Sequence, residues 1–299
     1  MYSVEYINCK VCGNDDYKIL GIRGNREYAG AMTSQGTGEH ITTNVVRCRR
    51  CGFVYTNPLI SAETNSYEDP SYYQSSSSVE AEVLFNYILR AIERYVLKGR
   101  LLDVGCGKGE FLSVAKKRGW QVNGLEPSVN LARFASDNSG LDVKTSSLKE
   151  AGYPRGYFDA VSLNMVLEHV DDPADLLADI QAVLKKDGLL FIEVPNMDSL
   201  MLNAAAWYFR FRGKNWSPLL SPLHYPFHCY GYNPSSIGCL LKRQGFSVKK
   251  IHIRDSLLRG FRPDSKGTFF EKAARNGITR IAGFLGRGDV MMVFANKLE

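Results

Sequence analysis

The residues with the clearest chemical meaning are four cysteines arranged as two pairs. Cys9 and Cys12 form one Cys-x-x-Cys-Gly turn, and Cys48 and Cys51 form a second turn of the same pattern. Such a turn brings two thiolates to one ion, and a second pair completes a closed tetrahedral shell. The glycine after each pair can take a positive φ, so the chain can turn sharply beneath the sulfurs. The paired spacing predicts a structural zinc site rather than unrelated thiols or two disulfides of a secreted protein.

A glycine-rich turn is the second chemical feature. Gly105, Gly107 and Gly109 follow a buried strand predicted at 100–104. Because glycine has no Cβ atom, the backbone there can approach a ligand closely. Glu126 stands at the end of the next predicted strand, where a carboxylate can bind the two hydroxyls of a ribose. Ligands of open α/β sheets bind at the carboxyl ends of strands, so the pattern predicts a site for a nucleotide-like cofactor.

Strand and helix signals alternate from residue 100 onward and place these residues in one sheet. The predicted strands are 100–104, 121–125, 158–164, 189–194, 246–253 and 291–296. The predicted helices are 79–98, 110–118, 128–138, 173–186 and 235–243. This rhythm is typical of a doubly wound, Rossmann-like parallel α/β sheet.

The chain divides into three predicted parts. Residues 1–58 read as a zinc-ribbon module of short strands, with a hairpin around the second cysteine pair. Residues 59–78 read as a linker or lid that contains Tyr73 and ends in a run of serines. Residues 79–299 form the catalytic domain, in which the aromatic-rich insertion 198–234 either caps the substrate or packs in the core.

Residues 100–196 resemble class I S-adenosylmethionine (SAM)-dependent methyltransferases. The segments Asp103–Gly109 and Gly124–Pro127 are similar to the first two motifs of that family. The segment from Phe158 to Pro173 is similar to the fourth motif, and residues 184–196 match the helix–strand unit that follows it. The cysteine knuckles also resemble those of zinc-ribbon methyltransferases, some of which act on deoxysugars.

The resemblance implies a role for each matching position. Asp103 and the glycines would hold the methionine end of SAM, Glu126 its ribose, and Asn164 would lie beside the sulfonium. Ser147 stands where the family often has an acidic residue beside the adenine, which is a departure from the pattern. The residues expected to bind the cofactor are Asp103, Gly105, Cys106, Gly107, Glu126, Pro127, Ser147 and Asn164.

Methyl transfer from a sulfonium depends mainly on alignment, and a base is needed only when the acceptor must lose a proton. His169 and His228 are the candidate bases, with packing in the core as the alternative for each. Tyr73 is expected to help close the site over the acceptor. A catalytic metal at His224 and His228 is rejected, because Pro222 and Pro226 argue against a helix there.

Bulk composition limits the class of protein. The chain has 299 residues, 44% of them hydrophobic and 23% charged, as in ordinary globular proteins. Its apolar runs stay below the ~18 residues that span a bilayer, and Met1–Glu5 lack signal-peptide character. We therefore expect a cytoplasmic protein without membrane insertion. The net charge of +6 suits an anionic partner but does not identify one.

The combined features favour a methyltransferase that acts on a small molecule, namely a sugar, a sugar nucleotide, a glycan terminus or a related metabolite. An RNA methyltransferase that grips RNA with its zinc ribbon is the alternative, although the chain lacks the Asn/Asp-Pro-Pro-Tyr motif for exocyclic amines. Nucleic acid is therefore not favoured as a partner. A dinucleotide-dependent oxidoreductase and a non-catalytic SAM-binding protein fit the motifs less well. The sequence carries no signal for an oligomeric state.

Overall fold

A seven-stranded sheet forms the centre of the structure, a computed structural model that describes residues 2–24, 42–62, 79–222, 228–255 and 281–298. The strand order is β12-β13-β10-β9-β6-β7-β8. The strands are β6 (Arg100–Val104), β7 (Gln121–Leu125), β8 (Val143–Lys144), β9 (Phe158–Asn164), β10 (Leu184–Pro195), β12 (Phe246–Arg254) and β13 (Val290–Lys297). The five neighbouring strands β10, β9, β6, β7 and β8 pair in parallel in that order. Strand β13 pairs antiparallel with both β10 and β12. The predicted doubly wound α/β fold is confirmed.

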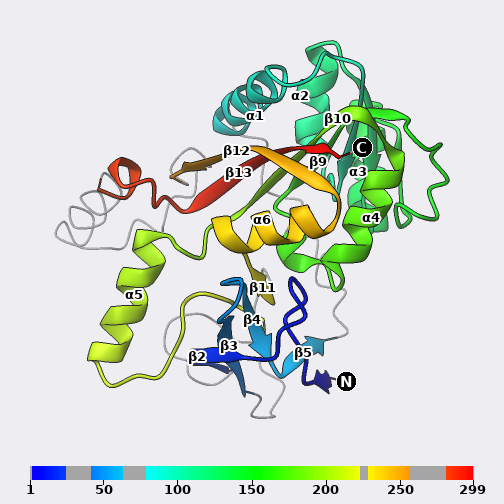
Figure 1. Cartoon of the computed structure of the whole chain (residues 1–299). Helices are drawn as coiled ribbons and strands as arrows, with labels where there is room; N and C mark the ends of the chain where they lie inside the picture. The colour runs from blue at the N-terminus through cyan, green and yellow to red at the C-terminus, as the bar shows by residue number, and fades with distance from the viewer. Residues whose placement is uncertain (1, 25–41, 63–78, 223–227, 256–280, 299) are drawn as a thin grey trace.

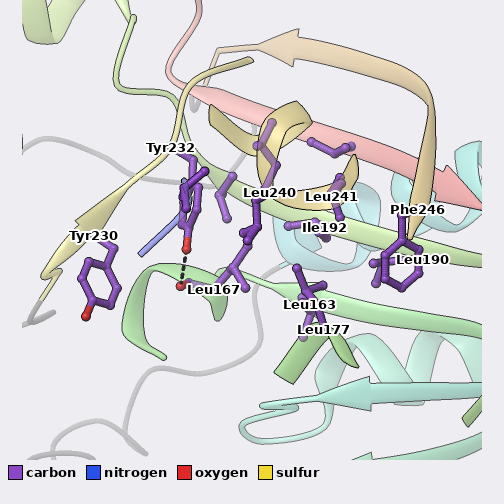
Figure 2. Packing of buried hydrophobic residues seen from close by; sticks show 14 of the residues in the cluster. Leu163, Leu167, Leu177, Leu190, Ile192, Tyr230, Tyr232, Leu240, Leu241 and Phe246 are labelled. Atoms are coloured by element: carbon purple, nitrogen blue, oxygen red, sulfur yellow. Dashed lines mark hydrogen bonds between the residues drawn. The ribbon is translucent and has the colours of Figure 1, made fainter. Parts of the chain in front are cut away.

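Helices cover both faces of this sheet (Figure 1). The helices around the sheet are α1 (Val79–Ile92), α2 (Glu110–Lys117), α3 (Val129–Ser139), α4 (Pro173–Val183) and α6 (Pro234–Arg243). Alternate residues of β10 point to opposite faces, as a pleated strand requires. Phe191 packs with Ile88 of α1 and Phe111 of α2, whereas Ile192 packs in the cluster that holds α4 and α6 (Figure 2). Among the described residues, no helix has the length and apolar character needed to cross a membrane.

Helix α4 is shorter than its sequence pattern predicts. The helix was expected to continue to residue 186, but it ends at Val183 and β10 begins at Leu184. Leu184 pairs with Phe158 of β9, and Tyr157 donates its backbone N–H to the carbonyl of Val183 at 2.7 Å. The neighbouring strand therefore provides hydrogen bonds at this point that a continued helix would have to break.

The N-terminal module is built from β1 (Tyr2–Glu5), β2 (Tyr17–Gly24), β3 (Thr42–Cys48), β4 (Val54–Asn57) and β5 (Leu59–Ala62). The predicted hairpin around the second cysteine pair is present as β3 and β4. Strand β5 pairs antiparallel with β1. Residues 59–62, the first part of the predicted linker, thus form a strand paired with β1. Tyr73 and the rest of the expected lid, 63–78, lie outside the described residues.

The expected insertion, 198–234, connects the seven-stranded sheet with the N-terminal module. It contains helix α5 (Leu200–Phe211) and the short strand β11 (Tyr230–Gly231). Strand β11 pairs antiparallel with β4, so the N-terminal sheet has the order β11-β4-β3-β2 (Figure 1). A segment that follows the cofactor-binding half of the chain thus completes the sheet that carries the cysteines.

Candidate active site and metal site

The glycine turn after β6 leaves the backbone open at one point. Gly105, Gly107 and Gly109 all have positive φ, with values of 70°, 54° and 74°. The N–H groups of Gly105 and Cys106 donate to the carbonyl of Leu125 at 2.7 and 3.0 Å, which fixes the turn against β7. A Cβ atom at Gly105 would lie 2.6 Å from Cγ2 of Val166, whereas one at Gly107 would meet nothing within 4 Å. The turn is therefore packed on one side and accessible to a ligand at Gly107.

Glu126 is held in place beside this open position. Its carboxylate accepts the backbone N–H of Gly107 through Oε2 at 2.8 Å and that of Ser128 through Oε1 at 3.0 Å. The side chain is largely buried, with 7% of Glu126 exposed. An ionised carboxylate can accept about four hydrogen bonds, which is the acceptor chemistry that a pair of ribose hydroxyls requires.

Asp103 lies beneath the turn and fixes Asn164 at the end of β9. Its Oδ1 accepts the hydroxyl of Ser162 at 2.6 Å and the amide of Asn164 at 2.9 Å. Burial raises the pKa of Asp103 to about 7, although the two hydrogen bonds act in the opposite direction. The Oδ1 atom of Asn164 is buried and has no hydrogen-bond partner within the described structure. An acceptor of this kind fits an ammonium group such as that of the methionine part of SAM.

The other three residues expected at the cofactor site lie around its edge. Cys106 turns its thiol into a small apolar cluster with Leu112, and burial raises the pKa of that thiol. Pro127 is exposed directly after Glu126. The hydroxyl of Ser147 donates to Glu150 at 2.7 Å and accepts the backbone N–H of Glu150 at 3.2 Å. Ser147 thus forms a local turn with Glu150.

The two candidate bases, His169 and His228, lie in contact with their rings tilted by 60°, although 59 positions separate them in the printed sequence. Their ring centroids are 4.7 Å apart. The carboxylate of Glu168 lies close to both, with its Oε1 at 4.0 Å from Nε2 of His169 and 3.9 Å from Nε2 of His228. Ligands that share one tetrahedral ion at ~2.1 Å would lie ~3.4 Å apart. The three side chains lie close enough to exchange a proton and could also offer one ligand atom each to a metal ion.

The electrostatic surroundings keep His228 neutral. Burial and, to a lesser extent, the neighbouring His169 lower the pKa of His228 to about 3. A neutral imidazole can accept a proton, but a pKa of about 3 makes His228 a weak base unless a neighbouring group stabilises the imidazolium. The carboxylate of Glu168, which is 1% exposed, lies where it can stabilise the imidazolium that forms. The structure thus brings together two histidines that the sequence identifies separately. His224 lies outside the described residues.

The four cysteines converge on one point in the N-terminal module. Their sulfurs all lie within 4.8 Å of one another, and the Cys9–Cys51 and Cys12–Cys48 pairs are each 3.5 Å apart. A disulfide needs about 2.05 Å, whereas sulfurs around one tetrahedral zinc at ~2.3 Å would be ~3.8 Å apart. All four side chains are buried. The arrangement therefore fits a closed four-thiolate metal site.

Backbone hydrogen bonds shape each cysteine knuckle as the sequence predicts. Gly13 donates its N–H to the carbonyl of Cys9 at 2.7 Å, and Gly52 donates to Cys48 at 3.0 Å. The φ angles of these glycines are 75° and 80°. Phe53, directly after the second knuckle, is fully buried. The knuckles therefore form a compact core of the module rather than an exposed loop.

Comparison with known proteins identifies the family. Residues 79–251, more than half of the chain, match the protein family described as "Methyltransferase domain". The chain belongs to this methyltransferase family. A crystal structure of a SAM-dependent methyltransferase from Archaeoglobus fulgidus has the same fold, with a TM-score of 0.51 and 24% identity over 72% of this chain and 94% of that one.

Two curated relatives carry named activities. The C-methyltransferase NovU of Streptomyces niveus is 24% identical over 257 residues, which cover 83% of this chain. A ubiquinone biosynthesis O-methyltransferase of Rhodopseudomonas palustris is 30% identical over 145 residues, which cover 44% of this chain. The matched region spans 57% of the length of each of these relatives.

Two residues of this methyltransferase site were missed from the sequence. Ser162 donates its hydroxyl to Asp103. The sequence feature that could have identified it is a polar residue within the largely apolar strand β9, at a position that the structure buries fully. Glu168 lies between the histidines, but it reads from the sequence as an ordinary acidic residue in a charged segment. Only the fold brings His228 next to Glu168, so no local pattern could have identified this cluster.

Proposed function

We propose that this chain transfers the methyl group of SAM to a small-molecule acceptor that loses a proton in the reaction. The observation that carries this proposal is the pairing of two sites. Gly107, Glu126 and Asn164 offer the groups that SAM requires, and the cluster of His169, Glu168 and neutral His228 lies beyond the end of β9. The acceptor class remains the one expected from the sequence: a sugar, a sugar nucleotide, a glycan terminus or a related metabolite.

The residues of the crevice fit SAM by their chemistry. Glu126 would accept the ribose hydroxyls, Gly107 would allow the cofactor to approach the backbone, and Asn164 Oδ1 would accept a hydrogen bond from the ammonium group. Asp103 would act through Asn164 rather than by direct contact, since its Oδ1 already holds that amide. SAM supplies an activated methyl group, so these residues need only bind and orient it.

His228 and His169 would accept the proton that the acceptor loses. The names of the two relatives state transfer to carbon and to oxygen. A C–H or O–H acceptor must give up a proton when its new bond to methyl forms, and a neutral imidazole can take it. Glu168 would orient the two rings and stabilise the resulting positive charge. The two-histidine cluster therefore supports an acceptor carbon or oxygen.

The four cysteines would hold one structural zinc ion and take no part in the chemistry. A closed shell of four thiolates leaves no ligand position for substrate, which is the mark of a structural zinc site. Its function would be to fix β3 and β4, the strands on which β11 and the following residues are built. The zinc module thus supports the histidine site through the pairing of β4 with β11.

Cofactor binding tests this function directly. Isothermal titration calorimetry should detect S-adenosylhomocysteine binding to the wild-type protein and no appreciable NAD binding. Glu126→Ala should weaken cofactor binding by roughly 1–3 kcal/mol, the scale of hydrogen bonds to a charged group. Glu82→Ala, which removes an exposed carboxylate on α1, is the matched control and should bind as the wild type does. A preference for NAD, or equal binding by the two variants, would overturn the assignment.

A further inference from the structure

A cavity of about 660 Å³ lies between helix α5 and the N-terminal sheet. Its wall includes Lys18 of β2, Arg47 of β3, Trp207 and Arg210 of α5, and Arg287 just before β13. None of these residues belongs to the crevice around Glu126 or to the histidine cluster. The cavity is therefore a separate feature of the molecule.

The N-terminal sheet separates this cavity from the histidine cluster. Alternate residues of a strand point to opposite faces. On β11 and just after it, Tyr230 and Tyr232 pack against Phe53 on the face towards Leu167, to whose carbonyl Tyr232 donates its hydroxyl at 3.3 Å (Figure 2). Gly231 faces the other way, and a Cβ atom there would lie 2.5 Å from the side chain of Met197. The cavity is on this second face.

The charge of the cavity wall is positive because its one acidic residue among the described lining residues is already paired. Asp198 accepts a 2.8 Å hydrogen bond from Arg47 through Oδ1 and a 3.0 Å bond from Asn233 through Oδ2. Lys18, Arg210 and Arg287 form no ion pair with any described residue. Within the described part of the chain, Arg287 donates its Nε to the carbonyl of Asp198 at 3.1 Å, and its two Nη groups make no hydrogen bond there. Three cations thus remain to bind an anion.

Trp207 adds an aromatic surface to this positive wall. It is 71% exposed, whereas Trp120 is 3% exposed and Trp216 is 8% exposed. Exposed tryptophan beside arginine and lysine is the combination that stacks on a base or ring while cations bind the adjoining phosphates. A solvated charged surface would not require the tryptophan to face the same cavity.

We propose that this cavity binds a diphosphate group through Lys18, Arg210 and Arg287, and that Trp207 contacts the ring when the diphosphate belongs to a nucleotide. The shared chemistry is a diphosphate group, which either a nucleoside diphosphate or free pyrophosphate can supply. The proposal does not rest on the proposed methyl transfer, because the two sites lie on opposite faces of the N-terminal sheet. A diphosphate bound here would lie outside the histidine cluster.

Titration of the full-length protein with uridine diphosphate and with pyrophosphate tests this site. Calorimetry should detect binding that weakens as salt rises, because the contacts are between charged groups. Arg210→Ala and Arg287→Ala should each weaken binding about tenfold or more, the scale of a charge-assisted hydrogen bond. Lys249→Ala, an exposed lysine outside the cavity, is the matched control. The affinity of each variant for S-adenosylhomocysteine confirms that it is folded.

Tryptophan fluorescence distinguishes the two sources of diphosphate. A nucleoside diphosphate that stacks on Trp207 should change the emission of the wild type, and Trp207→Phe should bind it with little loss but without that change. If uridine diphosphate binds more tightly than pyrophosphate and changes the emission, the ligand is a nucleotide. If both probes bind equally and the emission does not change, the ligand is free pyrophosphate. The proposal fails if neither probe binds at millimolar concentration, or if binding survives both arginine substitutions.

Discussion

Replacing Asp103 with asparagine should stabilise the cofactor-free protein above pH 7 while preserving the local hydrogen bonds. Asparagine has nearly the same shape and keeps an Oδ1 atom to accept from Ser162 and Asn164. It removes the negative charge, which burial disfavours. The residue that supports the cofactor site is therefore expected to destabilise the fold when no cofactor is bound.

The pKa of Asp103 sets the size of this effect. Burial raises that pKa from 3.8 to about 7. At 1.36 kcal/mol per pH unit, roughly three units correspond to an upper limit of ~4 kcal/mol in the free energy of unfolding. Between these two pKa values the unfolded chain has lost the proton and the folded chain retains it, so rising pH favours unfolding. The stability loss grows from about pH 4 to pH 7 and is complete above pH 7.

Urea unfolding at pH 5 and pH 8 measures this difference. Asp103→Asn should gain stability relative to the wild type at pH 8, and the gain should be much smaller at pH 5. Asp142→Asn removes an exposed carboxylate and serves as the control for a change in surface charge. If Asp103→Asn and the wild type show the same change in stability between the two pH values, the buried carboxylate is not ionised in the way we infer.

Two further predictions concern the metal and the histidine cluster. Elemental analysis of protein purified without chelators should find one zinc per chain, and a protein without zinc would contradict the proposed site. Cys48→Ala should lower thermal stability far more than Cys239→Ala, because structural zinc contributes directly to folding. His228→Ala should lower single-turnover methyl transfer by ~10²-fold or more and leave cofactor affinity nearly unchanged. A folded His228→Ala protein with full activity would show that this histidine only packs.

The cofactor half of the molecule could be predicted closely from sequence. Strands β6, β7 and β9 have the predicted limits, because each is a short apolar run with a clear helix or turn signal on both sides. The side chain of Ser128 accepts the N–H of Leu131 and caps α3, as its position before an amphipathic segment predicts. The glycine turn and Glu126 meet because parallel strands bring their carboxyl ends to one edge.

Features that depend on contacts between distant segments could not be predicted. Strand β11 has only two residues, and its strand geometry depends on pairing with β4. Strand β5 likewise depends on pairing with β1, and it lies just beyond the predicted module boundary at residue 58. Local patterns carry no information on such pairings. For the same reason the sequence identifies His169 and His228 as separate candidates but not as neighbours.

The contacts around the cysteine module predict that the proposed zinc ion supports the position of His228 and not the residues that would bind the cofactor. Phe53 follows the Cys48–Cys51 knuckle and packs against Tyr230 of β11, the strand that follows His228, and against Tyr232 directly after it. The contacts that hold Glu126 and Asn164 come instead from β6, β7, β9 and the turns after β6 and β7.

Removal of the metal should therefore loosen the position of His228 more than the cofactor crevice. We expect a chelator to lower turnover strongly while affinity for S-adenosylhomocysteine changes little, and added zinc should restore turnover. Calorimetry and single-turnover rates on the same chelated sample measure the two effects. If cofactor affinity and turnover fall together, the module supports the whole domain and not the histidine cluster alone.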